Sequence, residues 1–403
     1  MRSENNSWLR WVLIGAAIIQ PGCFISSENL VSDAAVSPPS EDASSRPDRD
    51  ASVAPVPDGE PPMPPPVDAE PPLPEGWWDG DWRTRYRVDL SFEGLDERAE
   101  GVPAVLWLKP DAVDLSLAGE GGRALRLVDS GGALLPIDIE SWSPDDGARV
   151  WFRLDVVSPD AVDPHVWLYV DNPTAPSVGA ATAVWDDDFS AVYHFSGGVL
   201  DATSNGLDGS RDESGVAGEE RHTGGRSWER EDAFLVADDP ELDLQSVTIS
   251  AWVRPSTRSH HHGVLSKRVG CGGRANYALF LASGRQVQFE FFNDRWRTWR
   301  TGDLRMNDWA HVSATFRARE GGGEVRIYIN GQERLAADSS IGLLADDNPV
   351  EIAGNGGCGG DYFEGDLDEV RVSRIARGPS WIRAAYHTMT SQLVRAIRDV
   401  ETL

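Results

Sequence analysis

The chain has 403 residues and a net charge of −28, because 65 acidic residues face only 37 basic ones. This charge argues against nucleic acid and against anionic membrane surfaces as partners, since both repel an acidic protein. The length allows two or three domains. Sixteen tryptophans, 40 glycines and little long helical periodicity favour an all-β protein.

The first 23 residues predict a targeting segment. A short apolar run, "WVLIGAAII", follows two arginines and ends at "QPGC". The run is too short to cross a bilayer as a stable helix. It resembles a bacterial lipoprotein signal, which implies lipidation of Cys23, contact with the membrane through this anchor only, and export to the outer membrane or the cell surface. Gln20 and Pro21 depart from that family's pattern, so a plain secretory signal is the alternative.

Residues 24–76 predict a disordered, acidic, proline-rich linker. They hold 13 of the 26 prolines and 11 acidic residues, and they include the run "PPMPPPVDAEPPLPEG". Such a composition cannot bury a core, and proline stiffness with charge repulsion keeps it extended. We expect it to hold the folded part away from a surface.

A first folded region begins at Trp77. Tyr86, Val88 and Leu90 alternate with polar residues, as in a half-buried strand. Further strands are predicted around an Asp-Ser-Gly-Gly turn and in "ARVWFRLDVV" and "HVWLYVDNPTA". We therefore predict a β-sandwich over residues 77–185. The opening tryptophans, the core from Asp129 to Trp142 and the closing strand resemble an uncharacterised bacterial extracellular module, which implies a surface location but no known chemistry.

A second β-sandwich is predicted over residues 186–398. Val247, Ile249, Ala251 and Val253 share one face of a strand, and Asn330-Gly331 indicates a hairpin turn. Landmarks in chain order are "AVYHFSGG", "VTISAWVRP", "NDWAHVSATF", "VRIYINGQ" and "FEGDLDEVRVSR". Together they resemble the laminin-G-like, concanavalin A-like lectin/glucanase jelly roll, which implies carbohydrate binding at the cell surface.

The acidic stretch "DYFEGDLDEV" also resembles the catalytic strand of laminarinase-type glucanases, with Glu364 and Glu369 as the two carboxylates. In a regular strand these two residues point to opposite faces, whereas retaining glycosidases need carboxyls about 5–5.5 Å apart. The laminin-G-like family has a recurring closing strand at this place, so the acids have a structural role without catalysis. We therefore expect no catalytic residues and no enzyme, and keep the glycoside hydrolase as an alternative.

The resemblance to this fold also implies one Ca²⁺ ion. Its ligands would come from the early Asp-rich turn and the closing strand, here Asp201, Asn205 and Asp368. These side chains offer the hard oxygens that Ca²⁺ prefers. The alternative is that Asp201 and Asn205 only form turns and that Asp368 makes a buried hydrogen bond.

Two cysteines besides Cys23 lie in glycine-rich turns. In an exported protein they predict a disulfide between Cys271 and Cys358, with two free buried thiols as the alternative. The run His260–His262 suggests zinc at first sight, but no cysteine or acidic partner has ligand spacing, so a solvated loop is expected.

For ligand binding, "FFNDRWRTWRTG" offers aromatic and guanidinium groups side by side. Trp296, Trp299 and Arg297 form a candidate platform, because aromatic faces stack on sugar rings and arginine donates paired hydrogen bonds. The alternative is that one of the tryptophans belongs to the core. The sequence thus predicts a non-enzymatic surface lipoprotein that binds a glycan or a surface protein, with a purely structural or cell-contact protein as a further alternative.

Overall fold

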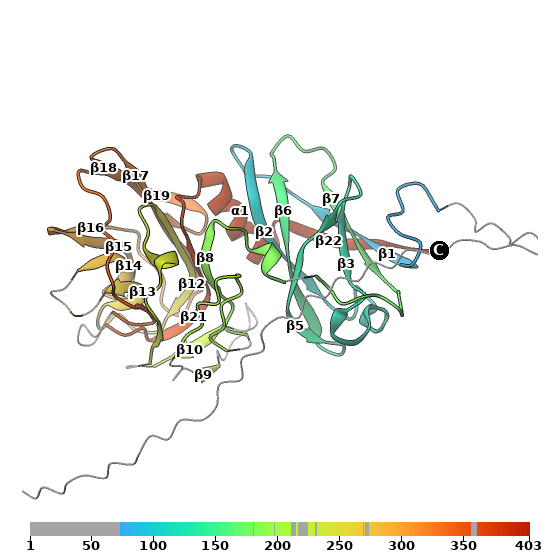
Figure 1. The fold of residues 1–403 in the computed structure, drawn as a ribbon, viewed down its shortest axis with the longest axis horizontal. Helices are drawn as coiled ribbons and strands as arrows, with labels where there is room; N and C mark the ends of the chain where they lie inside the picture. Colours follow the sequence, from blue (N-terminus) through green and yellow to red (C-terminus); the bar gives the residue numbers. More distant parts are fainter. Residues whose placement is uncertain are drawn as a thin grey trace, which may run out of the picture. The chain divides into compact units, whose positions relative to one another are not determined.

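The computed structural model describes residues 73–403, apart from 180, 197, 211–214, 217–224, 230, 231, 269, 271–273 and 356–360. Within these residues, antiparallel sheets pack in pairs around two apolar cores (Figure 1). The prediction of an all-β protein with two β-sandwiches is confirmed. None of the helices in this part of the chain is long and apolar enough to cross a membrane.

The first sandwich joins a sheet with the strand order β22-β1-β7-β3-β4 to a sheet with the order β2-β6-β5. Its elements are β1 (Thr84–Leu90), β2 (Ala99–Leu108), β3 (Arg126–Asp129), β4 (Leu134–Leu135), β5 (Ile137–Ser143), β6 (Gly147–Val157), β7 (His165–Val170), β22 (Val394–Thr402) and the short 3₁₀ helices η1 (Leu115–Ala118), η2 (Glu120–Gly122) and η3 (Ala181–Val184). Tyr86, Val88 and Leu90 lie in its core, as their alternation predicted.

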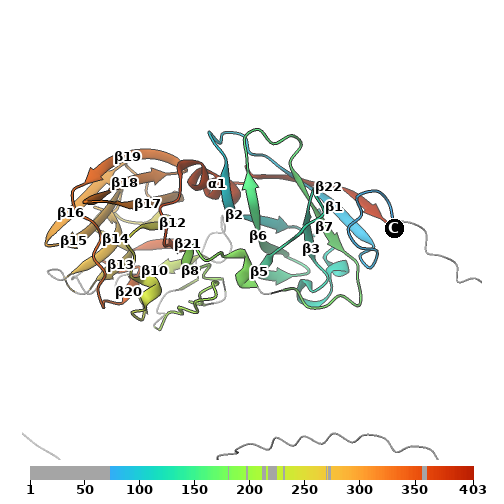
Figure 2. The same cartoon turned by 45° about the horizontal axis from the view of Figure 1, so that its top comes forward.

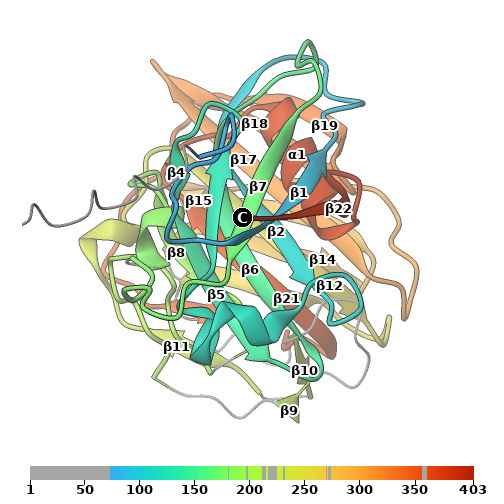
Figure 3. The same ribbon diagram turned by 90° about the vertical axis from the view of Figure 1, so that its right-hand side faces the viewer.

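The last strand of the chain belongs to this first sandwich. The sequence analysis placed the end of the second domain at residue 398, but β22 pairs antiparallel with β1, from Thr84 opposite Thr402 to Leu90 opposite Val394. Figure 3 shows β22 beside β1, with the C-terminus at its end. The chain therefore enters and leaves the folded part on neighbouring strands.

The tryptophans that open the folded region form a small cluster of their own. Trp77 and Trp82 are buried with Tyr169, and the Arg85 guanidinium lies 3.9 Å from the ring centre of Trp167 and 4.6 Å from that of Trp77. These cation–π contacts fix the start of the folded region against β7.

The second sandwich joins a sheet with the order β19-β18-β17-β12-β21-β10-β9, in which β8 also pairs with β21, to a six-stranded sheet with the order β11-β20-β13-β14-β15-β16. Its elements are β8 (Phe189–Tyr193), β9 (Gly215–Val216), β10 (Arg226–Trp228), β11 (Phe234–Val236), β12 (Val247–Pro255), β13 (His262–Arg268), β14 (Ala275–Ala282), β15 (Gln286–Asn293), β16 (Arg295–Thr301), β17 (Ala310–Arg319), β18 (Gly322–Ile329), β19 (Gln332–Ser339), β20 (Val350–Ile352), β21 (Gly365–Ser373) and the 3₁₀ helix η4 (Pro240–Leu242).

Two local predictions for the second sandwich are confirmed. The face of β12 that carries Val247, Ile249, Ala251 and Val253 lies in the core. Asn330 and Gly331 connect β18 to β19 with φ angles of 52° and 72°, the left-handed conformation that this turn requires.

The two sandwiches share β8 and a helix. Ala191 and Tyr193 of β8 lie in the second core, whereas Phe189 and Val192 lie in the first. Helix α1 (Pro379–Met389) contacts β2 of the first sandwich and β19 of the second, as Figure 2 shows. Apolar packing therefore continues from one sandwich into the other.

Candidate functional site

A groove crosses the outer face of the six-stranded sheet in the second sandwich. We call it the sheet groove. Its volume is ≈ 310 Å³. It is lined by His261, Arg268, Phe280, Gln288, Glu290, Trp296, Thr298, Arg300, Asn355 and Asp361. The lining is mixed, with two aromatic rings among polar and charged side chains.

The strand period explains why these side chains face outward. Val287, Phe289 and Phe291 of β15 lie in the core, so the alternating Gln288 and Glu290 point to the opposite face. The sequence analysis did not single out these two residues, although their alternation with apolar neighbours was a signal for them.

Hydrogen bonds fix the polar floor of the groove. The Glu290 carboxylate accepts hydrogen bonds from Gln288 Nε2 at 2.6 Å, Arg268 Nη1 at 3.2 Å and Thr298 Oγ1 at 3.3 Å. Burial raises the pKa of Glu290 and lowers the pKa of Arg268, and their mutual attraction opposes both shifts. Asn355 Nδ2 donates to Asp361 at 2.8 Å on the same wall. The groove thus presents donors and acceptors that are already held in place.

The predicted platform of two tryptophans is divided between the two faces of β16. Trp296 lines the sheet groove and is 36% exposed, with the Arg268 guanidinium 4.8 Å from its ring centre. Trp299 packs against the second core beside Phe289 and Phe291. Arg297 shares the face of Trp299 and donates to Ser340 Oγ at 2.6 Å. Of the three predicted ligand-binding residues, only Trp296 lies in the groove.

The two carboxylates of the glycosidase alternative are not among the residues that line the sheet groove. Glu369 is only 2% exposed, and its carboxylate accepts hydrogen bonds from His194 and Arg371. The Oε1 atom of Glu364 lies 3.6 Å from the Nε2 atom of His260. Glu369 therefore has no open access to a substrate in the groove.

The three predicted calcium ligands have different surroundings. Asp201 accepts hydrogen bonds from the backbone N–H groups of Val192, Thr203 and Leu207, and Asn205 Nδ2 donates to the backbone oxygens of residues 189 and 190. Asp368 is fully buried, and neither of its oxygens has a hydrogen-bond partner. The calcium site remains a prediction. The lipidation site Cys23 and the predicted disulfide between Cys271 and Cys358 lie outside the described residues.

The sequence analysis expected the run His260–His262 to be a solvated loop, and this is wrong for His262. His262 is buried in β13, and its ring stacks on that of His260 with 4.6 Å between centroids. Burial, with the neighbouring histidines, lowers the pKa of His262 to about 4. His262 is carried inward with its strand, because its neighbours Val264 and Leu265 on β13 belong to the second core.

A second group of charged residues is buried where β5 and β6 of the first sandwich meet β8 and β21 of the second. We call it the junction cluster. It consists of Asp138, Glu140, Arg149, His194, Asp368, Glu369 and Arg371. His194 Nδ1 lies 2.7 Å from Glu369 Oε1, and its Nε2 lies 3.5 Å from Asp138 Oδ2. Sequence reasoning had no signal for the contact between His194 and Glu369, since 175 positions separate them in the chain.

Strong fields act inside the junction cluster. Burial alone would lower the pKa of His194, but Glu369 and Asp138 raise it to about 10. Burial would raise the pKa of Glu369, but His194 and Arg371 lower it to about 2. Burial and the Glu369 carboxylate together raise the pKa of Asp368 well above its ordinary value. A neutral Asp368 beside a charged Glu369 is therefore the stable arrangement when only protons are available.

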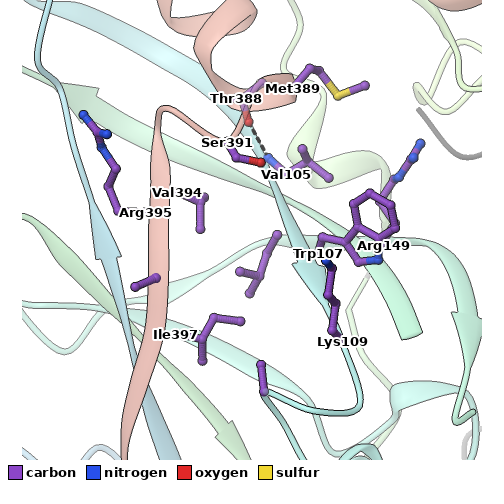
Figure 4. A pocket seen from close by; sticks show the side chains of 13 residues that line it. Val105, Trp107, Lys109, Arg149, Thr388, Met389, Ser391, Val394, Arg395 and Ile397 are labelled. Atoms are coloured by element: carbon purple, nitrogen blue, oxygen red, sulfur yellow. Dashed lines mark hydrogen bonds between the residues drawn. The ribbon is translucent and has the colours of Figure 1, made fainter. Parts of the chain in front are cut away.

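A further pocket of about 330 Å³ lies beside β22, and we call it the β22 pocket (Figure 4). Val394 and Ile397 of β22 form one wall, and Trp107, with Lys109 and Arg149 beside it, forms the other. Thr388 also lines the pocket, and its hydroxyl accepts a hydrogen bond of 2.7 Å from the Val105 backbone N–H. No aspartate or glutamate is among the described residues that line this pocket, and its walls are mostly apolar.

Comparison with known families agrees with this architecture. Residues 229–383 match the model of the concanavalin A-like lectin/glucanases superfamily, and residues 121–203 match a domain of unknown function (DUF2341). The two matches lie in the order that the sequence analysis expected, with the module of unknown function before the concanavalin A-like domain. No curated protein sequence matches the chain at a significant level.

Among solved structures, the chain is similar to the binding domain of botulinum neurotoxin serotype D, with 12% identity, a TM-score of 0.40 and coverage of 50% of this chain and 51% of that one. It is also similar to domain 4 of an extracellular arabinanase from Geobacillus stearothermophilus, in complex with arabinotriose, with 17% identity, a TM-score of 0.40 and coverage of 49% and 98%. A carbohydrate-binding module of a Ruminococcus gnavus sialidase, bound to α2,3 sialyllactose, gives 16% identity, a TM-score of 0.36 and coverage of 40% and 96%. The chain thus spans about half the length of the neurotoxin binding domain.

Proposed function

We propose that this protein is a non-enzymatic, exported glycan-binding protein whose ligand lies in the sheet groove. The observation that carries the proposal is the exposed Trp296 indole beside a floor of fixed donors and acceptors. The match of residues 229–383 to the concanavalin A-like lectin/glucanases superfamily supports it.

The chemistry of the groove suits a sugar. A pyranose ring has an apolar face that packs on an indole and hydroxyl groups that exchange hydrogen bonds with planar side chains. Gln288, Glu290 and Arg268 supply such planar groups, and Arg300 adds an exposed guanidinium at the rim. Because the floor is held by its own hydrogen bonds, a ligand would find the site largely preformed.

The test is a glycan array with the full chain, followed by affinity measurements on the glycan that binds. Trp296→Ala should weaken binding at least ~10-fold, equivalent to ~1.4 kcal/mol. Trp107→Ala is the matched control, because Trp107 is 41% exposed in the other sandwich, and it should leave the affinity unchanged.

Two results would contradict the proposal. Silence of the wild type on the array would favour a protein partner or a purely structural role. Equal affinities of the Trp296→Ala variant and the wild type would move the glycan to another surface. Repeating the array with EDTA, and again with Ca²⁺ added back in excess, tests the predicted calcium ion. If Asp201, Asn205 and Asp368 hold it, EDTA should weaken binding and Ca²⁺ should restore it.

Location at the outer membrane through a lipid on Cys23 is part of the same proposal, and the sequence of the first 23 residues supports it. Metabolic labelling with a palmitate analogue tests it directly. The label should appear on the full chain and be lost in the Cys23→Ala variant.

A further inference from the structure

The junction cluster contains a group of side chains of the kind that holds a transition metal. Glu140, His194 and Glu369 each offer one ligand atom, and these atoms lie within 4.8 Å of one another. Glu140 lies on β5, Glu369 lies on β21, and His194 directly follows β8, so the fold alone brings them together. Glu140 belongs to the first sandwich, whereas His194 and Glu369 belong to the second.

A fourth group with free ligand atoms lies in the same cluster. Asp368 is 0% exposed, both of its carboxyl oxygens are without a hydrogen-bond partner, and its charge interacts with those of Glu369, Glu140 and His194. His194 Nε2 also lacks a hydrogen bond, although Asp138 Oδ2 lies 3.5 Å away. Buried polar atoms are seldom left unpaired, so these atoms point to a group that would satisfy them.

The outer sides of the ligands are already supported. Arg149 Nη1 lies 2.9 Å from Glu140 Oε1, and Trp151 Nε1 donates to Glu140 Oε2 at 2.7 Å. Arg371 Nη2 donates to the second oxygen of Glu369 at 2.6 Å. Metal-ligating carboxylates are commonly oriented by such hydrogen bonds.

From this geometry we infer that the junction cluster binds one Zn²⁺ ion through Glu140, His194 and Glu369. One imidazole and two carboxylates suit zinc, whereas Ca²⁺ takes six to eight oxygens. Asp368, next to Glu369 in the chain, adds a buried carboxyl group without a hydrogen-bond partner. The imidazole nitrogen that binds the ion must carry no proton, so a protonated His194 would release one proton to the solvent on binding.

A zinc ion at this position would connect the two sandwiches, since its ligands come from both. The inference does not depend on the glycan proposal, because the junction cluster and the sheet groove share no residue.

The test is a zinc titration of the chelator-treated full chain, carrying no histidine tag, in competition with a chromophoric chelator. One Zn²⁺ per chain is expected. Ligand removal in Glu369→Gln or His194→Asn should weaken binding at least ~100-fold, since even supporting residues contribute ~10–100-fold. His165→Asn is the matched control, because His165 lies away from the junction beside Asp163, and it should bind zinc as the wild type does.

A measurement on the wild type covers the case in which the variants fail to fold. X-ray absorption of the zinc-loaded chain should show one imidazole nitrogen and carboxylate oxygens at ~2.0–2.2 Å, without sulfur. The inference would be overturned by sulfur or several imidazoles around the ion, or by no zinc binding at micromolar concentrations. The cluster would then be held by its hydrogen bonds and ion pairs alone. Zinc binding that survives both ligand substitutions would overturn the inference as well.

Discussion

Trp296 and Trp299 stand three residues apart on β16, and this odd spacing places them on opposite faces of the sheet. The sequence analysis applied the same rule to Glu364 and Glu369 but not to these tryptophans, so it combined an outward and an inward side chain in one platform. It did keep open the alternative that one of them belongs to the core, and Trp299 packs there.

The two tryptophans should therefore differ in their effect on stability. Trp299→Ala removes an indole that packs on Phe289 and Phe291, and we expect the free energy of unfolding to fall by ~2–3 kcal/mol. Trp296→Ala should change it by less than ~1 kcal/mol, because this side chain is partly exposed. Urea denaturation of both variants measures the difference, and equal losses would contradict the assignment of faces.

His311 gives the protein a defined sensitivity to acid. Burial, with a smaller effect of the Arg371 charge, lowers the pKa of His311 to about 3, and its ring packs against Trp252 and Tyr386. In the unfolded chain a histidine has a pKa of ~6.5, so the unfolded state takes up the proton first. The contribution of His311 to the free energy of unfolding is therefore fully present above that pH. Below it, the free energy of unfolding falls by ~1.4 kcal/mol per pH unit, down towards pH 3.

Replacing His311 by phenylalanine isolates this effect. Lowering the pH from 7 to 5 should reduce the free energy of unfolding of the wild type by ~1–3 kcal/mol more than that of His311→Phe. The His261→Phe variant is the control, because His261 is exposed. Parallel pH profiles for wild type and His311→Phe would show that His311 is not held neutral.

At the scale of single elements, β21 shows how a bulge redirects a strand. The register of β21 against β12 shifts between residues 250 and 252, and Glu369 has a φ angle of 51°. The bulge lets Asp368 and Glu369 both contribute to the junction cluster while Leu367 and Val370 stay in the core. Strict alternation, which the sequence analysis used, would have put Asp368 and Glu369 on opposite faces.

Strand β22 has one side against the first core and one in solvent. Ile397 packs against the core, whereas Val400 is 59% exposed on the same strand. Ile397→Asp should therefore lower the free energy of unfolding by ~2–4 kcal/mol, while Val400→Asp should cost less than ~1 kcal/mol. Thermal unfolding measures both, and similar melting temperatures would contradict the pairing of β22 with the first sandwich.

At the scale of the whole molecule, the sequence predicted the fold class because its signals are local. Alternation in β12 and the Asn330-Gly331 turn depend on residues close together in the chain. The contents of the sheet groove and the junction cluster depend on which strands become neighbours. His194 meets Glu369 across 175 positions, and no spacing rule reports such a contact. Helix α1 was also not predicted, because its short apolar face is defined by the surfaces of β2 and β19 that it covers.

The shared packing predicts that the two sandwiches unfold together. Val192 of β8 and Ile382 of α1 lie in the first core, while β8 is hydrogen-bonded to β21 of the second sandwich. Calorimetry of the full chain should show one transition, with the calorimetric enthalpy close to the van't Hoff enthalpy. Two well-separated transitions would mean that the junction contributes little to stability.

The pairing of β1 with β22 has a mechanical consequence. Thr84 faces Thr402 and Leu90 faces Val394, so the two strands run in opposite directions, and the free end of β22 lies where β1 begins. A pulling force applied between these two ends would load the backbone hydrogen bonds one after another, as in opening a zip, and a small force suffices for that. The same force applied between the start of β1 and the start of β22 would load these hydrogen bonds together, in shear, and would meet a higher resistance.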